Sequence, residues 1–314
     1  MGLAKIVALQ TLLMFLFMAV GYTLFKTKKI TQEGCKTIAN VLVYAILPAV
    51  IIKSFCKNPT VENMTALGFS AILGFLAVFI SILVSRLFFK NAPLDEFATS
   101  FSNVGFFGIP LIQATPLGAD GVFYIAAIVA FVNIGQWTYG VMRITDKPLK
   151  EVLSPKKLLL SPFVIATLIG MALFFSGLGV TIKEVEITKT LVYGVIDGLS
   201  LANTPLAMVV IGVYLAQTDF KSLFTTKAVY MTGLVRLVIV PAVLTLVFWI
   251  IPIDYSIKLA VFIAAICPVG SNVAVYAQLH GKDYSHAVKT VTMSTVFSIL
   301  TMPLFIMLVT NLWV

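Results

Sequence analysis

The chain has 314 residues, of which 60% are hydrophobic and only 11% are charged, and its mean hydropathy is +1.03. A soluble chain carries about a quarter charged residues, so this composition excludes an ordinary soluble protein. The net charge of +9 does not indicate nucleic-acid binding, because most Lys and Arg residues flank apolar blocks, as membrane topology requires. These blocks are continuous rather than alternating, which excludes a membrane β-barrel.

The apolar blocks have the length that an α-helix needs to cross a bilayer, about 20 residues. The first block is followed by the charged run KTKK, which is typical of a stop-transfer flank rather than of a cleaved signal. We therefore predict an all-α polytopic membrane protein with ten transmembrane spans. They cover residues 6–25, 38–55, 66–89, 98–117, 122–142, 161–180, 191–216, 229–251, 259–279 and 290–312.

Lys and Arg residues are unevenly divided between the two sets of alternating connections. The richer set includes the central loop RITDKPLKEVLSPKK, which contains Lys150 and Lys156. By the positive-inside rule this set faces the cytoplasm, so both termini are expected outside the cell membrane.

The central loop, residues 143–160, divides the chain into two parts of five predicted spans, residues 1–142 and 161–314. Because five is odd, the second part must be inverted relative to the first, which predicts an inverted repeat. Short matches support it: Ala45 and Pro48 of the second span recur as Ala202 and Pro205 of the seventh. Each of these two prolines could equally well produce a kink that helps the helix pack or line a binding site.

Helix breakers lie inside the fourth and ninth predicted spans, in the stretches FSNVGFFGIP and CPVGSNVAVYAQ. The fourth span contains Gly105, Gly108 and Pro110, and the ninth contains Pro268 and Gly270. Proline removes a backbone donor and displaces the carbonyl four residues back, and glycine lets the chain turn. Both sets of breakers lie near the midplane of the membrane. Irregular backbone there is tolerated where it is buried in protein or lines a watery cavity. Packing kinks in membrane helices are the simpler alternative.

Two interrupted helices in corresponding positions point to a secondary transporter's binding site. The helix that begins after each break presents free N–H groups and the positive end of its dipole, which favour an anion. Asn103 and Asn272 lie beside the breaks, and their amides could donate to a carboxylate or close the broken ladder. The predicted substrate-binding residues are Asn103, Gly105, Pro110, Pro268, Gly270 and Asn272.

The stretches NVGFFGIPL and CPVGSNVAVYAQLHG, together with ten spans and a basic central loop, resemble the auxin efflux carrier family. That family includes plant PIN-formed auxin carriers and bacterial malate and malonate permeases. In the plant carriers a proline precedes the crossover asparagine, whereas here Ser102 precedes Asn103. The short central loop is similar to that of prokaryotic permeases, which implies small organic acids, mono- or dicarboxylates, rather than auxin.

The resemblance also implies an architecture shared with bile-acid symporters and sodium/proton antiporters. The fourth and ninth spans would cross at the midplane of the membrane. Spans 1, 2, 6 and 7 would form a scaffold that also makes a homodimer, and the other six spans would form a moving, elevator-type transport domain.

Four further polar residues are candidates for coupling or gating. Arg236 is well inside a span, where ionisable groups are costly and often functional, although it could instead pair structurally or snorkel. Asp197, near the outer end of the seventh span, is the best candidate for a proton-carrying carboxylate, unless it is a solvated acid at the interface. Gln113 and Gln278 occupy matching places in the broken spans. Because no Asp or Glu accompanies the amides at the membrane centre, proton coupling or uniport is favoured over sodium symport.

The remaining residues indicate neither cofactor nor metal. Cys35, Cys56 and Cys267 have no ligand spacing, and His280 and His286 are interpreted as polar residues of a cytoplasmic loop. An intramembrane enzyme is disfavoured, because no known catalytic arrangement lies within a span. A sodium-coupled symporter and a membrane sensor that binds ligand without transport remain as alternatives.

Overall fold

The structure is a computed structural model that describes residues 3–152, 160–218 and 226–313. Throughout these ranges the secondary structure is helical, and the only extended pairing is an isolated antiparallel bridge between Ser102 and Val269.

Seven helices in the described residues are long and apolar enough to cross a membrane. They cover Lys5–Lys26, Gln32–Phe55, Val61–Phe88, Gly118–Thr145, Glu186–Gln217, Lys227–Ile250 and Tyr284–Leu312. An eighth span is formed if two helices that meet at a bend of 84°, Pro162–Phe175 and Leu178–Glu184, are taken together. The predicted class, an all-α polytopic membrane protein, is therefore confirmed.

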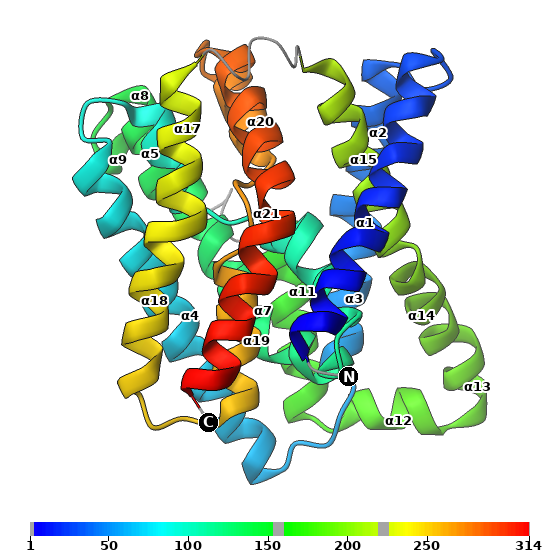
Figure 1. The fold of residues 1–314 in the computed structure, drawn as a ribbon. Helices are drawn as coiled ribbons and strands as arrows, with labels where there is room; N and C mark the ends of the chain where they lie inside the picture. The colour runs from blue at the N-terminus through cyan, green and yellow to red at the C-terminus, as the bar shows by residue number, and fades with distance from the viewer. Residues whose placement is uncertain (1–2, 153–159, 219–225, 314) are drawn as a thin grey trace.

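The elements of the first part of the chain, as labelled in Figure 1 where there is room, are helical throughout. They are α1 (Leu3–Lys26), α2 (Gln32–Val41), η1 (Leu42–Ile46), α3 (Leu47–Phe55), α4 (Val61–Phe88), α5 (Pro93–Ser100), η2 (Val104–Gly108), α6 (Ile109–Gln113), α7 (Gly118–Gly135), η3 (Gln136–Gly140), α8 (Val141–Thr145) and α9 (Leu149–Val152).

The described elements of the second part of the chain are also helical. Its elements are α11 (Pro162–Phe175), α12 (Leu178–Glu184), α13 (Glu186–Thr188), η4 (Lys189–Tyr193), α14 (Gly194–Leu201), α15 (Asn203–Gln217), α17 (Lys227–Leu234), η5 (Val235–Ile239), α18 (Val240–Ile250), α19 (Tyr255–Ala265), α20 (Asn272–Leu279) and α21 (Tyr284–Leu312).

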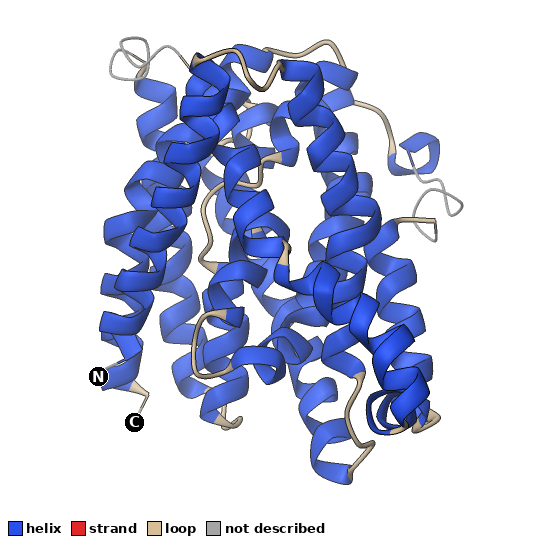
Figure 2. Ribbon diagram, turned by 90° about the vertical axis from the view of Figure 1, so that its right-hand side faces the viewer, coloured by secondary structure: helices blue, strands red, loops and turns tan. Residues whose placement is uncertain are grey.

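The predicted fourth and ninth spans are interrupted. The fourth corresponds to α5, a short non-helical stretch, and η2 with α6; the ninth corresponds to α19, a longer stretch, and α20. Figure 2 shows loop segments inside the helix bundle at mid-height, as the glycines and prolines of these spans predict.

The five η elements are single π-helical turns, and three of them end two residues before a proline. Pro48, Pro110 and Pro241 are each the second residue of the α-helix that follows the turn. Each proline ring crowds the carbonyl four residues back, and a wider π turn moves that carbonyl aside. These prolines reshape their helices without ending them, so the break predicted at Pro110 is not located there.

Helices α1 and α15 pack with their backbones in contact. A Cβ at Gly21 would lie 2.2 Å from the carbonyl oxygen of Val209, and one at Gly212 would lie 2.0 Å from that of Met18. Only glycine permits this approach, which is typical of membrane helix pairs. Figure 1 shows this pair on one side of the molecule, away from α4, α17 and α18.

The start of α1 and the end of α21 lie at the same end of the molecule, as Figure 1 shows. An even number of membrane crossings requires this arrangement. The predicted basic central loop is only partly described: Lys150 lies in α9, whereas Lys156 lies outside the described residues.

Candidate functional site

The two interrupted segments cross each other at their breaks. The backbone N–H of Asn103 donates to the carbonyl of Pro268 at 2.9 Å, and the N–H of Gly270 donates to the carbonyl of Phe101 at 3.1 Å. These bonds accompany the isolated bridge between Ser102 and Val269. The backbone groups that leave their helices therefore pair with the other segment, as buried polar groups must.

Gly270 is needed for this close crossing. A Cβ at this position would lie 3.3 Å from the carbonyl oxygens of both Phe101 and Ser102, closer than ordinary contacts. The backbone N–H of Val269, the residue before Gly270, donates to the hydroxyl of Ser294 in α21 at 3.1 Å. Pro268 itself needs no acceptor, because it has no N–H.

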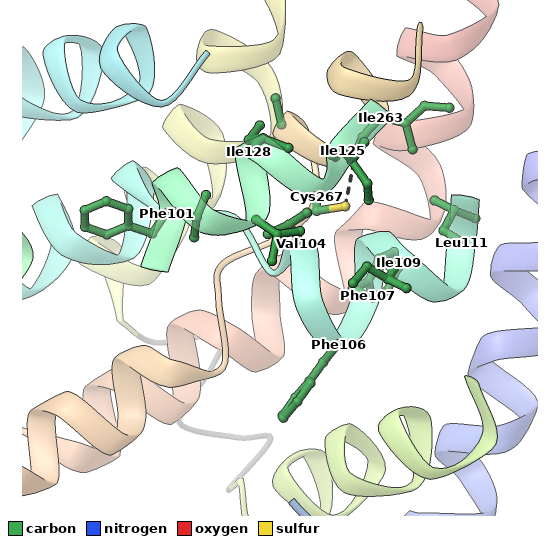
Figure 3. Packing of buried hydrophobic residues seen from close by; sticks show 14 of the residues in the cluster. Phe101, Val104, Phe106, Phe107, Ile109, Leu111, Ile125, Ile128, Ile263 and Cys267 are labelled. Atoms are coloured by element: carbon green, nitrogen blue, oxygen red, sulfur yellow. Dashed lines mark hydrogen bonds between the residues drawn. The ribbon is translucent and has the colours of Figure 1, made fainter. Parts of the chain in front are cut away.

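Apolar side chains pack around the crossing, as Figure 3 shows. Cys267 lies close to Val104 there, and its thiol donates to the carbonyl of Ile263 at 3.2 Å. A Cβ at Gly108 would lie 3.1 Å from the Cys267 sulfur. Gly108 therefore lets the second segment approach the first, rather than breaking its own helix.

A cavity of about 500 Å³ opens beside the crossing. Residues of both breaks line it, and its rim includes the exposed residues Lys36, Leu160 and Leu279. Lys36 is the only charged residue among the described residues that line it. The volume lies within the range of small-ligand sites, about 300–1,000 Å³.

The two crossover asparagines line this cavity but differ in their partners. The Asn272 amide Nδ2 donates to Oε1 of Gln136 at 3.1 Å. Asn103 is 5% exposed, and its Nδ2 has no hydrogen-bond partner among the described residues. A buried donor without an acceptor is unusual and requires an explanation; a bound acceptor in the cavity would supply one.

The remaining predicted binding residues divide into two pairs. Gly105 and Gly270 line the cavity with the asparagines. Pro110 and Pro268 are buried nearby and are not among its lining residues. Pro48 and Pro205 do not line it either.

Arg236 is fully buried in η5 and does not snorkel to a surface. Its Nε donates to the carbonyl of Cys267 at 2.9 Å, its Nη1 donates to that of Thr99 at 3.1 Å, and its Nη2 donates to that of Ala265. The guanidinium therefore connects α17–α18 to both interrupted segments.

Asp197 forms an ion pair with Lys53, and both side chains are partly exposed. Lys53 also lines a second, smaller cavity of about 290 Å³, together with Gln113. There Gln113 accepts a hydrogen bond at 3.1 Å from the amide of Asn203 in α15. Gln278, in contrast, is exposed near the end of α20 and lines neither cavity, so the structure does not bring it to the crossing.

The connection expected between the third and fourth predicted spans is partly helical, because α5 already begins at Pro93. Glu96 is fully buried in its first turn, where Arg86 and Arg143 donate to its Oε2 at 3.1 and 2.9 Å. The hydroxyl of Tyr139 donates to its other oxygen. Paired carboxylates at a helix start are stable there because the dipole favours negative charge.

His286 is likewise not a loop residue. It lies in the first turn of α21, and its Nε2 is 2.6 Å from Oδ1 of Asp95, which also accepts a hydrogen bond from Thr232 at 2.8 Å. Asp95 thereby connects α5 to α17 and α21.

Sequence reasoning missed the role of Gln136 at this site. Gln136 is 2% exposed, lines the cavity and orients Asn272. Asn133, one turn earlier, lines the same cavity. Two amides three residues apart share one helix face, and this spacing within an apolar span was the available signal.

Interrupted helices that cross inside an apolar bundle, beside a cavity lined in part by amide side chains, point to a membrane transporter. The family described as "Membrane transport protein" matches residues 6–306. The chain belongs to this family, the auxin efflux carriers and malate–malonate permeases, so the predicted resemblance is confirmed.

One curated relative is similar along most of its length. It is a protein of Rhizobium meliloti (strain 1021) described as "Putative malonate transporter". The two sequences are 24% identical over 299 residues, which cover 90% of this chain and 89% of the relative.

Proposed function

We propose that this protein is a secondary transporter of small organic anions, mono- or dicarboxylates such as malonate, which bind in the 500 Å³ cavity. The observation that carries the proposal is the buried, unpartnered amide of Asn103 at the crossing. A carboxylate oxygen is the acceptor that this donor lacks. The similarity to a described malonate transporter supports the same substrate class.

In this proposal the architecture is ten spans in two inverted five-helix repeats, residues 1–142 and 161–314, with the interrupted segments as the fourth and ninth spans. The cavity lies between the two groups of helices that an elevator mechanism requires. Its walls include Tyr44, Phe163 and Tyr214 from the scaffold spans, and Asn103 and Asn272 from the moving spans. An anion bound to the moving spans crosses the bilayer as they slide along the scaffold.

The proposed state is open to the cytoplasm. The rim of the larger cavity includes Lys36 of α2 and Leu279 of α20, and both helices lie at the end of the molecule far from the chain termini in Figure 1. By charge distribution this end faces the cytoplasm, which leaves both termini outside the plasma membrane. The smaller cavity, lined by Lys53 and Gln113, is then on the outer side.

Thermal shift tests binding, and uptake tests transport. A carboxylate that binds only the folded protein raises its melting temperature. We expect malonate or a related acid to do so, and proteoliposomes to accumulate the same acid. Binding without uptake would favour the sensor, and hydrolysis of the added ligand would favour an enzyme; a screen in which no mono- or dicarboxylate stabilises the protein would contradict the proposal.

A further inference from the structure

The position of Arg236 is unusual because it converges on two helix ends at once. Thr99 is the penultimate residue of α5, and Ala265 is the last residue of α19. Cys267 follows two residues later, in the non-helical stretch. All three carbonyls accept from one guanidinium, so a single side chain caps the ends of both interrupted helices before they cross.

The carbonyls at a helix end have no partner within the helix and carry the negative end of its dipole. Where such ends meet inside a membrane transporter, they form a natural binding place for a small cation such as Na⁺. Here the guanidinium of Arg236 already occupies that place, through hydrogen bonds from three of its N–H groups.

The charge of Arg236 is not neutralised by a carboxylate. None of the ion pairs within the described ranges includes it. Asp95 accepts a hydrogen bond from Thr232 of α17, one turn before Arg236, but its ion-pair partner is His286. A fully buried cation balanced mainly by carbonyl dipoles is costly, and an anion at the same crossing would offset that cost.

We propose that Arg236 is a built-in cation that takes the place of a coupling Na⁺ at the carbonyl ends of α5 and α19. It holds the two helix ends together and supplies positive charge to the anion site on their far side. This inference rests on the proposed function as an anion transporter. It makes anion uptake independent of Na⁺, and it makes Arg236 a positioning residue rather than one that touches the substrate.

The first arm of the test uses the unmodified protein. Malonate uptake into proteoliposomes is measured in NaCl, KCl and N-methylglucamine chloride at equal ionic strength. The proposal expects equal initial rates in the three salts. A rate that rises with an inward Na⁺ gradient, or a melting temperature that rises with Na⁺ but not with K⁺, would overturn it.

The second arm uses Arg236→Ala and Arg236→Lys. Loss of three charge-assisted hydrogen bonds is expected to lower uptake by Arg236→Ala at least about 100-fold. Millimolar guanidinium chloride should restore part of the uptake and of the melting temperature by refilling the vacated place, and Arg236→Lys should retain intermediate uptake. If Arg236 had a purely structural role, added guanidinium would change neither the uptake nor the melting temperature of Arg236→Ala. Folded Arg236→Ala with full uptake, or with no response to guanidinium in either readout, would contradict the proposal.

Two controls separate this inference from the proposed function. Guanidinium should not restore uptake by Asn103→Ala, whose defect lies in the anion site. If the unmodified protein neither binds nor transports any carboxylate, the proposed function fails. The melting temperature of Arg236→Ala with and without guanidinium still tests whether a cation binds at the carbonyl ends of α5 and α19. Should Arg236→Ala not fold without guanidinium, folding in its presence supports the inference and failure to fold in its presence opposes it.

Discussion

The two crossover asparagines illustrate how similar residues in sequence acquire different roles. Asn272 already donates to Gln136, whereas the amide of Asn103 is buried without an acceptor. An unpaired buried donor lowers the stability of the empty protein and is a strong donor to an arriving carboxylate. We therefore place more of the binding free energy on Asn103.

Asn103→Ala is expected to weaken anion binding by roughly 10- to 150-fold, because a hydrogen bond to a charged group contributes about 1.5–3 kcal/mol, at about 1.4 kcal/mol per decade. The melting temperature of the empty protein should not fall, since no hydrogen bond in the structure is lost. Calorimetric titration and thermal unfolding measure the two effects. A large loss of stability without loss of affinity would assign the residue a structural role.

Asn272→Ala should behave differently. It removes the bond to Gln136, so we expect a loss of about 1 kcal/mol in unfolding free energy and a smaller loss of affinity than for Asn103→Ala. The same two measurements apply to both variants. Equal effects of the two substitutions on affinity and stability would contradict the proposed difference.

Asp197→Asn tests proton coupling at the residue scale. If Asp197, which pairs with Lys53, is the proton carrier, the variant should bind malonate normally but take it up more slowly under an inward proton gradient. Glu184→Gln, another acid at the same end of the molecule, provides the control. Unchanged proton-driven uptake by Asp197→Asn would remove Asp197 from the coupling step.

At the scale of elements, the sequence predicted which helices are interrupted, and in the ninth span it also predicted where, at Pro268 and Gly270; in the fourth span it did not. Gly105, Gly108 and Pro110 were the obvious breakers, yet η2 and α6 run through them, and the break lies at Phe101–Asn103. It is stabilised there by hydrogen bonds to the other interrupted segment, and such long-range partners are not visible in local propensity.

The burial of Asp95 and Glu96 was missed for the same reason. Their partners Arg143, Thr232 and His286 are distant in sequence. From the sequence alone, two adjacent acidic residues at the edge of an apolar block are interpreted as part of a loop. Only the three-dimensional structure shows the partners that allow them to be buried.

The α1–α15 contact gives a prediction at this scale. Gly212→Ala places a methyl group against the Met18 carbonyl, so we expect a loss of unfolding free energy of about 1–3 kcal/mol or more. Gly233→Ala in α17 is the matched control, because its Cβ would meet nothing within 4 Å; there alanine should be neutral or stabilising by up to about 1 kcal/mol. Thermal unfolding in detergent compares them, and equal melting temperatures would refute the close packing.

At the scale of the whole molecule, the composition and charge pattern were enough to predict the class, because the bilayer imposes helix length and basic flanks. The family was predicted from the resemblance of the stretches NVGFFGIPL and CPVGSNVAVYAQLHG. The described termini share one end of the molecule, as predicted (Figure 1). Orientation in the membrane remains a prediction. A cysteine introduced at Lys150 should be labelled only from the cytoplasmic side, and labelling by an impermeant reagent in intact cells would invert the assignment.

The homodimer is a further prediction at this scale, and it derives from the family resemblance. Contact should involve the scaffold helices, such as α1 and α11, so cysteines on their exposed faces should cross-link between protomers in lipid bilayers. Cross-linking that returns only monomers would remove the dimer while leaving the transport proposal intact.

The central claim is that an organic anion binds at the crossing and is carried across the membrane there. Its most direct test is uptake of radiolabelled malonate into proteoliposomes by the unmodified protein, Asn103→Ala and Asn311→Ala. Asn311 is an exposed asparagine of α21 whose amide bonds only its own helix, to the carbonyl of Met307. We predict normal uptake by the unmodified protein and by Asn311→Ala, and uptake reduced at least about tenfold at subsaturating malonate by Asn103→Ala. Uptake by folded Asn103→Ala equal to that of the other two proteins would contradict the account.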